Sequence, residues 1–255
     1  MPIMNWTALT ERGKTILVLG VIALGVIAVG VGIWYDSSLA NRSESSGGLG
    51  YQPTAEPDAP AVDLTRIAFI GDSYTAGVGA PNQNGYARLT AKELGATPQI
   101  SADSGSGYLK PGQGGMTMLA LVEAAKRTPT PPDVVVLASG YNDNLGNPPS
   151  EVPFRAAVEE TFAAARAWAP DADIVVVGPW TPQGSATANQ TIVNTVLRSE
   201  AGESGFEFVD SLAPPLVRAD MIGDDKIHPT PQGHQVLADE ITTALRERVP
   251  AFNPS

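Results

Sequence analysis

The chain has 255 residues with 16 basic and 27 acidic side chains, a formal net charge of −11, two histidines and no cysteine. The lack of cysteine excludes disulfides, a thiol nucleophile and thiolate metal sites, and two histidines exclude a three-histidine metal centre. The acidic balance disfavours binding to nucleic acid or to anionic lipid, because both need clustered lysine and arginine.

Residues 16–35 form an apolar run that predicts a membrane-spanning helix. The run contains no charged side chain and, at about 1.5 Å per residue, reaches about 30 Å, the thickness of one bilayer core. Arg12 and Lys14 precede it, so the excess of positive charge puts residues 1–14 in the cytoplasm. We therefore expect a transmembrane helix at 15–35 in a single-pass cell-membrane protein whose remaining chain lies outside.

The alternative for the same segment is a signal peptide that is cleaved near Ala40. Ser38 and Ala40 are small residues at the spacing of a cleavage site, and cleavage there would secrete the protein. Residues 36–63 are rich in Ser, Gly and Pro, which predicts a flexible linker. Residues 64–255 then form one domain, long enough to bury a core without metal or disulfides.

Beyond the linker, short β-branched runs alternate with longer Ala- and Leu-rich stretches. The runs at 134–138 and 174–177 are apolar throughout, which indicates strands buried on both faces and hence a parallel sheet. The alternation predicts an α/β fold, a three-layer α/β/α sandwich with a five-stranded parallel sheet of flavodoxin-like type. In chain order the expected elements are strand 66–70, helix 85–94, strand 98–102, helix 115–127, strand 134–138, helix 152–168, strand 174–177, helix 186–203, strand 206–209 and helix 231–248.

Small-residue loops follow the first two predicted strands. The first strand ends in Gly71-Asp72-Ser73, where a serine at a tight strand-to-helix turn is well placed to be an exposed nucleophile. An ordinary N-cap serine is the alternative interpretation. The loop after the second strand contains Gly105 and Gly107, whose backbone N–H groups either face a ligand or only form a turn.

Polar groups also follow the third strand and precede the last helix. The Asn142 amide is suited either to donate to developing negative charge or to form a turn. Asp225 stands three residues before His228, close enough to fold back onto Nδ1 and aim Nε2 at a serine as a general base. A surface-loop role is the alternative for His228. We expect His234 to be a structural residue on the face of the last helix.

Together these residues resemble the four sequence blocks of the SGNH family, also called GDSL hydrolases. The resemblance implies the SGNH hydrolase fold, although the family's usual leucine after the serine is replaced by Tyr74. It covers about residues 64–249. In the family's order, the blocks read Gly71-Asp72-Ser73, Gly105, Gly140-Tyr141-Asn142-Asp143 and Asp225-Lys226-Ile227-His228.

The resemblance assigns a role to each of these polar groups. It implies that Ser73 is the nucleophile, His228 the general base and Asp225 the partner that orients the imidazole. It also implies an oxyanion hole made by the backbone N–H groups of Ser73 and Gly105 and by the Asn142 amide. Gly107 is the alternative to Gly105.

The substrate site is less well defined by the sequence. Tyr74 and Trp180 are candidate substrate-binding residues, with packing an equal alternative for Trp180. The loops at 142–150 and 179–184 are short and rich in Pro and Gly, without a long apolar lid. We therefore expect short acyl groups, acetyl above all, rather than long ones.

The resulting functional prediction is a serine esterase that forms an acyl-enzyme on Ser73 and needs no metal or organic cofactor. Its substrate is a small acylated compound or an acylated glycan, outside the cell or in the cell envelope. The expected partners include the membrane, through the N-terminal helix, and exclude nucleic acid, and we expect a monomer. Two alternatives remain open: an acyltransferase that uses the same three residues, and a non-catalytic glycan-binding domain on the same fold.

Overall fold

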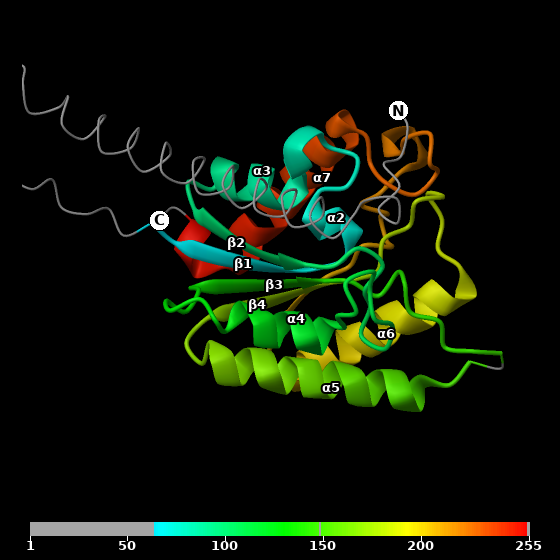
Figure 1. The fold of residues 1–255 in the computed structure, drawn as a ribbon, viewed down its shortest axis with the longest axis horizontal. Helices are drawn as coiled ribbons and strands as arrows, with labels where there is room; N and C mark the ends of the chain where they lie inside the picture. Colours follow the sequence, from blue (N-terminus) through cyan, green and yellow to red (C-terminus); the bar gives the residue numbers. More distant parts are fainter. Residues whose placement is uncertain (1–63, 148, 254–255) are drawn as a thin grey trace, which may run out of the picture. The chain divides into compact units, whose positions relative to one another are not determined.

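The computed structural model describes residues 64–147 and 149–253, which form a five-stranded parallel sheet with helices on both faces (Figure 1). The strand order is β2-β1-β3-β4-β5. The first strand, β1, therefore lies inside the sheet, β2 forms one edge, and β3, β4 and β5 follow in order toward the other edge. This confirms the predicted five-stranded parallel sheet. The strands are β1 (Arg66–Gly71), β2 (Thr97–Ala102), β3 (Val134–Ala138), β4 (Asp173–Val177) and β5 (Glu207–Val209).

The helices form the outer layers (Figure 1). Three of them, α4, α5 and α6, cover one face of the sheet, while α3 and α7 cover the other. The helices are α2 (Ser73–Ala76), α3 (Tyr86–Glu93), α4 (Met118–Ala125), α5 (Glu151–Trp168), α6 (Ala188–Glu203) and α7 (Pro231–Arg248). Short 3-10 turns lie at η2 (Pro81–Gln83), η3 (Ala219–Met221) and η4 (Pro250–Phe252).

Side chains of the central strands alternate between the two faces and so build two cores. In β3, Val135 and Leu137 pack with the α4–α6 layer, whereas Val134 and Val136 pack with the α3–α7 layer. All five positions of β3 are buried. This double burial is why the strand reads as a continuous apolar run, and it gives the three predicted layers.

Capping residues account for the small differences between predicted and observed helix ends. Thr117 accepts a hydrogen bond from the Ala120 N–H, so α4 begins at Met118 instead of residue 115. Thr187 forms a capping box with Gln190, which starts α6 two residues later than predicted.

The predicted cytoplasmic segment 1–14, transmembrane helix 15–35 and linker 36–63 lie outside the described residues and stay predictions. Within 64–147 and 149–253, every helix is too short or too polar to cross a bilayer.

Candidate active site

The carboxyl ends of β1, β2 and β3 bring the predicted polar residues to one edge of the sheet. β1 ends at Gly71, whose backbone approaches its neighbour so closely that a Cβ atom would stand 2.3 Å from the Ala138 carbonyl oxygen. Asp72 then caps the single turn of α2, because its carboxylate accepts a hydrogen bond of 3.0 Å from the Tyr74 N–H. The tight turn leaves Ser73 as the first residue of α2.

Ser73, His228 and Asp225 form a continuous hydrogen-bonded chain. The Ser73 Oγ lies 2.9 Å from His228 Nε2, and His228 Nδ1 lies 2.7 Å from Asp225 Oδ2. The contact between Ser73 and His228 joins residues 155 positions apart in the sequence. This arrangement permits the imidazole to take the serine proton while the carboxylate stabilises the imidazolium that forms.

The loop before α7 holds His228 in place through its own backbone. Asp225 Oδ1 accepts hydrogen bonds from the N–H groups of Ile227 and His228, at 3.0 and 2.9 Å. These bonds and the imidazole together lower the pKa of Asp225 to about 2, so the carboxylate is ionised at neutral pH. Lys226 adopts the left-handed conformation, with φ of 62°, that the tight turn requires. The Tyr74 hydroxyl donates to the Ile227 carbonyl at 2.5 Å, which ties the loop to the body of the domain.

The three predicted oxyanion-hole donors line the same cavity as the serine. The backbone N–H groups of Ser73 and Gly105 donate to no acceptor among the described residues. The Gly107 N–H, by contrast, already donates to the Lys110 carbonyl at 2.8 Å. This difference favours Gly105 over Gly107 as a donor. Asn142 Nδ2 donates to the Ser106 carbonyl at 3.0 Å and, more weakly, to Asp72 Oδ2 at 3.5 Å, and these two contacts orient the amide at the cavity wall.

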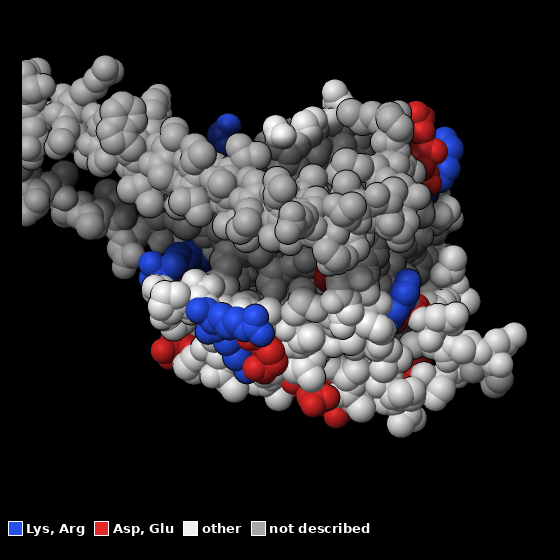
Figure 2. Space-filling view, viewed as in Figure 1, with Lys and Arg blue, Asp and Glu red and all other residues white. Residues whose placement is uncertain are grey.

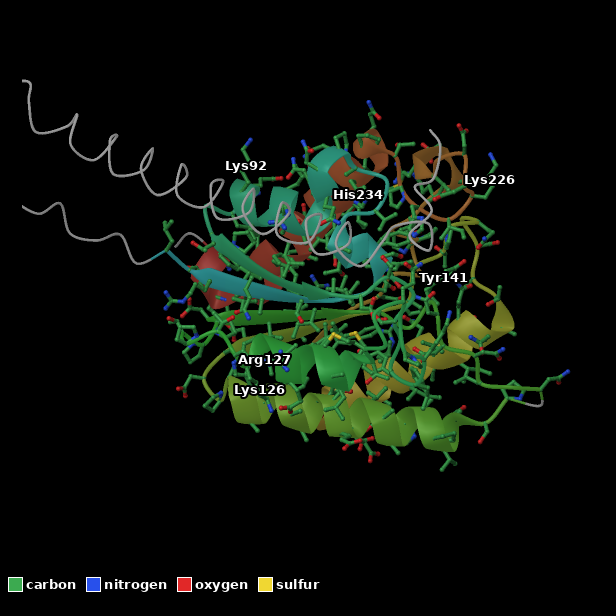
Figure 3. The ribbon with its side chains drawn as sticks, in the orientation of Figure 1. Lys92, Lys126, Arg127, Tyr141, Lys226 and His234 are labelled. Carbon is green, nitrogen blue, oxygen red and sulfur yellow. The ribbon has the colours of Figure 1, made fainter. Side chains whose placement is uncertain are left out.

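A cavity of about 320 Å³ opens above these groups. Tyr141 contributes to its wall, and Figure 3 shows this residue at the end of the sheet toward which the strand arrows of Figure 1 point. Its full lining consists of Ser73, Val78, Ser104, Gly105, Gln113, Tyr141, Asn142, Ile227 and His228. An ester bound in this cavity would contact both the serine and the candidate oxyanion donors.

Tyr74 and Trp180 lie in the protein core and not in the cavity wall. Both side chains have 0% exposure, and neither lines the cavity. Their rings stack with centroids 5.2 Å apart and an interplanar angle of 11°. The structure therefore corrects the predicted substrate contact of Tyr74, because α2 turns its ring inward toward the core. For Trp180 it agrees with the packing alternative.

The sequence analysis assigned no role to Asp72 beyond its place in the motif. This side chain is fully buried, and burial raises its pKa to about 7. Its Oδ1 accepts from the Trp180 Nε1–H at 3.3 Å, while Oδ2 lies 3.5 Å from Asn142 Nδ2. Asp72 thus links the turn that carries the serine to the loop that carries Asn142. The Gly-Asp-Ser sequence could have indicated that Asp72 is an N-cap, but nothing in it indicates that the Asp72 side chain is buried.

Asp143 supports the loop that carries Gly105. It is 2% exposed, and it accepts hydrogen bonds from the N–H groups of Tyr108, Leu109 and Lys110 at 2.8 to 3.2 Å. A Cβ atom at Gly107 would lie 2.4 Å from the Asp143 carboxylate. The closeness of this contact explains the glycine without giving Gly107 a chemical role.

His234 is a structural residue, as predicted. Its ring is fully buried, with Nδ1 accepting from the Tyr86 N–H at 3.2 Å and Nε2 donating to the Val78 carbonyl at 2.9 Å. Burial lowers its pKa, which keeps the ring neutral and matches this pattern of hydrogen bonds.

The fold and the site together define a class of α/β hydrolases with a serine, a histidine and an aspartate at the carboxyl ends of a parallel sheet. Residues 69–236 match the GDSL-like Lipase/Acylhydrolase family, and the chain belongs to that family. It is 32% identical over 192 residues to the GDSL lipase Rv0518 of Mycobacterium tuberculosis (strain ATCC 25618 / H37Rv), covering 71% of this chain and 82% of the relative. The chain is therefore a carboxylic ester hydrolase of the SGNH/GDSL type, as its motifs predicted.

Solved structures with a similar fold include several esterases. A family two carbohydrate esterase from Clostridium thermocellum has 22% identity and a TM-score of 0.56, over 73% of this chain and 64% of that chain. The acetyl xylan esterase Est2A from the rumen bacterium Butyrivibrio proteoclasticus has 18% identity and a TM-score of 0.54, over 74% and 65%. The psychrotrophic esterase EstA from Pseudoalteromonas sp. has 13% identity and a TM-score of 0.56, over 72% and 97%. The chain spans less than two thirds of the two carbohydrate esterases, and these likenesses show the fold alone.

Proposed function

We propose that this protein is a serine esterase that removes short acyl groups, acetyl above all, through an acyl-enzyme on Ser73. The observation that carries the proposal is the hydrogen-bonded chain from the Ser73 Oγ through His228 to Asp225. These three side chains supply a nucleophile, a general base and an orienting carboxylate within hydrogen-bonding distance of one another.

In the proposed reaction, the Ser73 Oγ attacks the ester carbonyl carbon while its proton moves to His228 Nε2. The carbonyl oxygen becomes an oxyanion that accepts hydrogen bonds from the Ser73 and Gly105 N–H groups and from the Asn142 amide. The imidazolium then gives its proton to the departing alcohol oxygen, which leaves the acyl group on Ser73. Water attacks this acyl-enzyme with His228 again as base, so the acid departs and the serine regains its proton.

The preference for short acyl groups rests on the size of the catalytic cavity. Its volume of about 320 Å³ lies at the lower end of the range of about 300 to 1,000 Å³ that ligand sites occupy. Val78 and Ile227 are the aliphatic side chains in its lining, which suits a small acyl group better than a long chain.

The alcohol portion of the proposed substrate is a glycan of the cell envelope or of the surroundings. This class of substrate is proposed by analogy with two proteins of similar fold, a carbohydrate esterase and an acetyl xylan esterase. The apolar segment at residues 16–35 supports a location at the cell membrane, with the hydrolase domain outside. Secretion after cleavage near Ala40 is the competing location.

A chain-length series of p-nitrophenyl esters tests the proposed reaction. We expect the full chain to hydrolyse the acetate and the butyrate faster than the decanoate and the laurate, and the Ser73→Ala variant to hydrolyse none of them. A rate that peaks at the laurate with no acetate hydrolysis would contradict the proposed acyl preference. Activity that survives in the Ser73→Ala variant would contradict the proposed nucleophile.

Fractionation tests the proposed location. We expect the full chain to stay in the membrane pellet after an alkaline carbonate wash. Recovery of a soluble mature chain that begins at Asn41 would establish the signal peptide instead.

A further inference from the structure

A second cavity adjoins the catalytic cavity, between α3 and the loop of residues 103–117. It has a volume of about 330 Å³, and it shares Ser104 and Gln113 with the catalytic cavity, so the two hollows have a common wall. Its lining consists of Ala76, Gln83, Arg88, Ile100, Ala102, Asp103, Ser104 and Gln113. A substrate bound at Ser73 therefore has a neighbouring hollow into which its other portion can extend.

Three polar side chains in the lining of the second cavity have no hydrogen-bond partner within residues 64–147 and 149–253. Among the described residues, nothing forms a hydrogen bond or an ion pair with the Arg88 guanidinium or with the side-chain amides of Gln83 and Gln113. The guanidinium is a donor only, whereas each amide both donates and accepts. Asp103 adds a carboxylate to the same lining. The cavity thus offers donors and acceptors together, the combination that a hydroxyl group needs.

The cavity walls are held in shape before any ligand binds. Asp103 accepts hydrogen bonds from the N–H groups of Gly114 at 2.9 Å and of Met116 at 3.1 Å. The Gln113 N–H donates to the Ser104 carbonyl at 2.8 Å, which fixes the residue that stands between the two cavities. Such preorganisation lowers the entropic cost of binding a ligand.

The backbone on the opposite wall is strained. Asn82 and Gln83 both adopt positive φ angles, 53° and 55°, which are costly for residues other than glycine. Gln83 lines the cavity from this strained turn. Backbone strain of this kind clusters at active sites and ligand clamps, so the turn is consistent with a binding role for this wall.

From these features we infer that the cavity lined by Arg88, Gln83, Asp103 and Gln113 binds the alcohol portion of the substrate, and that this portion is a sugar. The inference rests on the proposed esterase function and extends it by assigning the residues that recognise the alcohol. An acyl chain does not suit this lining, because it would desolvate the Arg88 guanidinium without giving it a hydrogen-bond acceptor. A neutral polyol suits it better than an anion, because Arg88 and Asp103 both line the cavity.

The inference is tested by replacing Arg88 with methionine, which keeps the aliphatic stem and removes the donors. We compare kcat/KM for O-acetylated xylotriose with kcat/KM for p-nitrophenyl acetate, whose leaving group carries no sugar hydroxyl. We expect Arg88→Met to lower the ratio of the two constants by about 10- to 100-fold, mainly through KM for the sugar ester. An unchanged ratio would overturn the inference.

Arg127→Met is the matched control. Arg127 is exposed and follows α4 at the end of the sheet opposite Tyr141, as Figure 3 shows. Figure 2 shows basic and acidic side chains next to one another over this end of α4, where Lys126 pairs with Glu123. We expect Arg127→Met to leave the ratio unchanged, and a fall as large as that of Arg88→Met would also overturn the inference.

Direct binding separates failure of the inference from failure of the esterase proposal. Calorimetric titration of the full chain carrying Ser73→Ala with xylotriose needs no turnover. We expect saturable binding that weakens by about 10-fold or more when Arg88→Met is added. Absence of binding, or binding that Arg88→Met leaves intact, would overturn the sugar site even if p-nitrophenyl acetate is hydrolysed. If xylotriose binding depends on Arg88 but the wild-type chain hydrolyses no ester, the sugar site is retained and the esterase proposal is refuted.

Discussion

The two halves of the candidate site are built in opposite ways. The oxyanion half rests on buried groups: Asp72 is 0% exposed, and it lies between the serine turn and Asn142. The base half stands on a surface loop, where the Asp225 side chain is 51% exposed. The two halves meet where His228 reaches the Ser73 Oγ and where the Tyr74 hydroxyl donates to the Ile227 carbonyl.

This difference follows from what each half has to do. Oxyanion donors gain most when they are fixed in advance in a site that excludes water, and strand ends provide such fixed positions. An aspartate that orients an imidazole has to stay ionised, and exposure together with two backbone N–H donors achieves this for Asp225. The comparison predicts that substitutions in the base half change activity with little loss of stability. In the oxyanion half, loss of the Asn142 amide should lower activity, whereas loss of the buried Asp72 carboxyl should change the stability of the fold.

Asp225→Asn gives the largest expected effect. The replacement keeps the size of the side chain but presents an amide to His228 Nδ1, which favours the wrong imidazole tautomer. We expect kcat to fall by about 10³- to 10⁴-fold, as in serine proteases with the equivalent change, at a nearly unchanged melting temperature. The neighbouring Asp224→Asn is the control and should retain activity. A loss of less than threefold for Asp225→Asn would remove Asp225 from the site.

Asn142→Ala comes next and tests the oxyanion half. Loss of the amide donor should lower kcat by about 10²- to 10³-fold with little change in KM. The matched control is Asn144→Ala, because the Asn144 side chain accepts from the Gly146 N–H within a turn and lies outside the cavity lining. If Asn142 only forms a turn, both variants will lose a similar small amount of stability and keep their turnover.

Asp72→Asn tests the buried carboxyl through the pH dependence of stability. Folding raises the pKa of Asp72 from 3.8 to about 7, so the folded state binds more protons than the unfolded state between these values. The free energy of unfolding of the wild type should therefore fall as the pH rises through this interval, by about 2 to 4 kcal/mol.

Urea unfolding at several pH values measures this slope. We expect Asp72→Asn to make it clearly shallower, while Asp143, whose pKa is also raised by burial, retains a contribution of the same sign. The exposed Asp171→Asn is the control and should leave the slope as it is. Equal slopes in wild type and Asp72→Asn would show that Asp72 is ionised in the folded protein.

Tyr74→Phe gives the smallest expected effect and tests the tie between the two halves. The change removes only the hydroxyl that donates to the Ile227 carbonyl and preserves the stack on Trp180. One hydrogen bond contributes about 0.5 to 1.5 kcal/mol, so kcat/KM should fall by about 2- to 10-fold as His228 loses its fixed position. A direct substrate-binding role, which the sequence predicted for Tyr74, would instead appear as a KM that rises more for larger esters.

The sequence predicted the parts of the molecule that depend on local patterns. Apolar runs such as β3 indicate a parallel strand because burial on both faces leaves no polar position. The spacing of Asp225 and His228 indicates a short turn that lets one side chain reach the other, and the structure brings both to Ser73.

The parts that the sequence did not predict depend on long-range contacts. Tyr74 reads as a loop residue beside the serine, but the loop of Ile227 and the ring of Trp180 cover it. The second cavity also depends on long-range contacts. Arg88 and Gln113, which line it, come from separate segments, and no local pattern predicts that these segments meet. Folding places these residues together, so only the structure shows them as neighbours.

The central claim is that His228 and Asp225 activate Ser73 as a nucleophile, and covalent labelling tests it most directly. The full chain is treated with a fluorophosphonate, and the modified residue and the labelling rate are found by mass spectrometry. The account predicts stoichiometric labelling at Ser73, no labelling of Ser73→Ala, and slow labelling of His228→Ala, because without the imidazole the serine keeps its proton. Labelling of Ser73→Ala as fast as that of the wild type, or wild-type rates in His228→Ala, would contradict it.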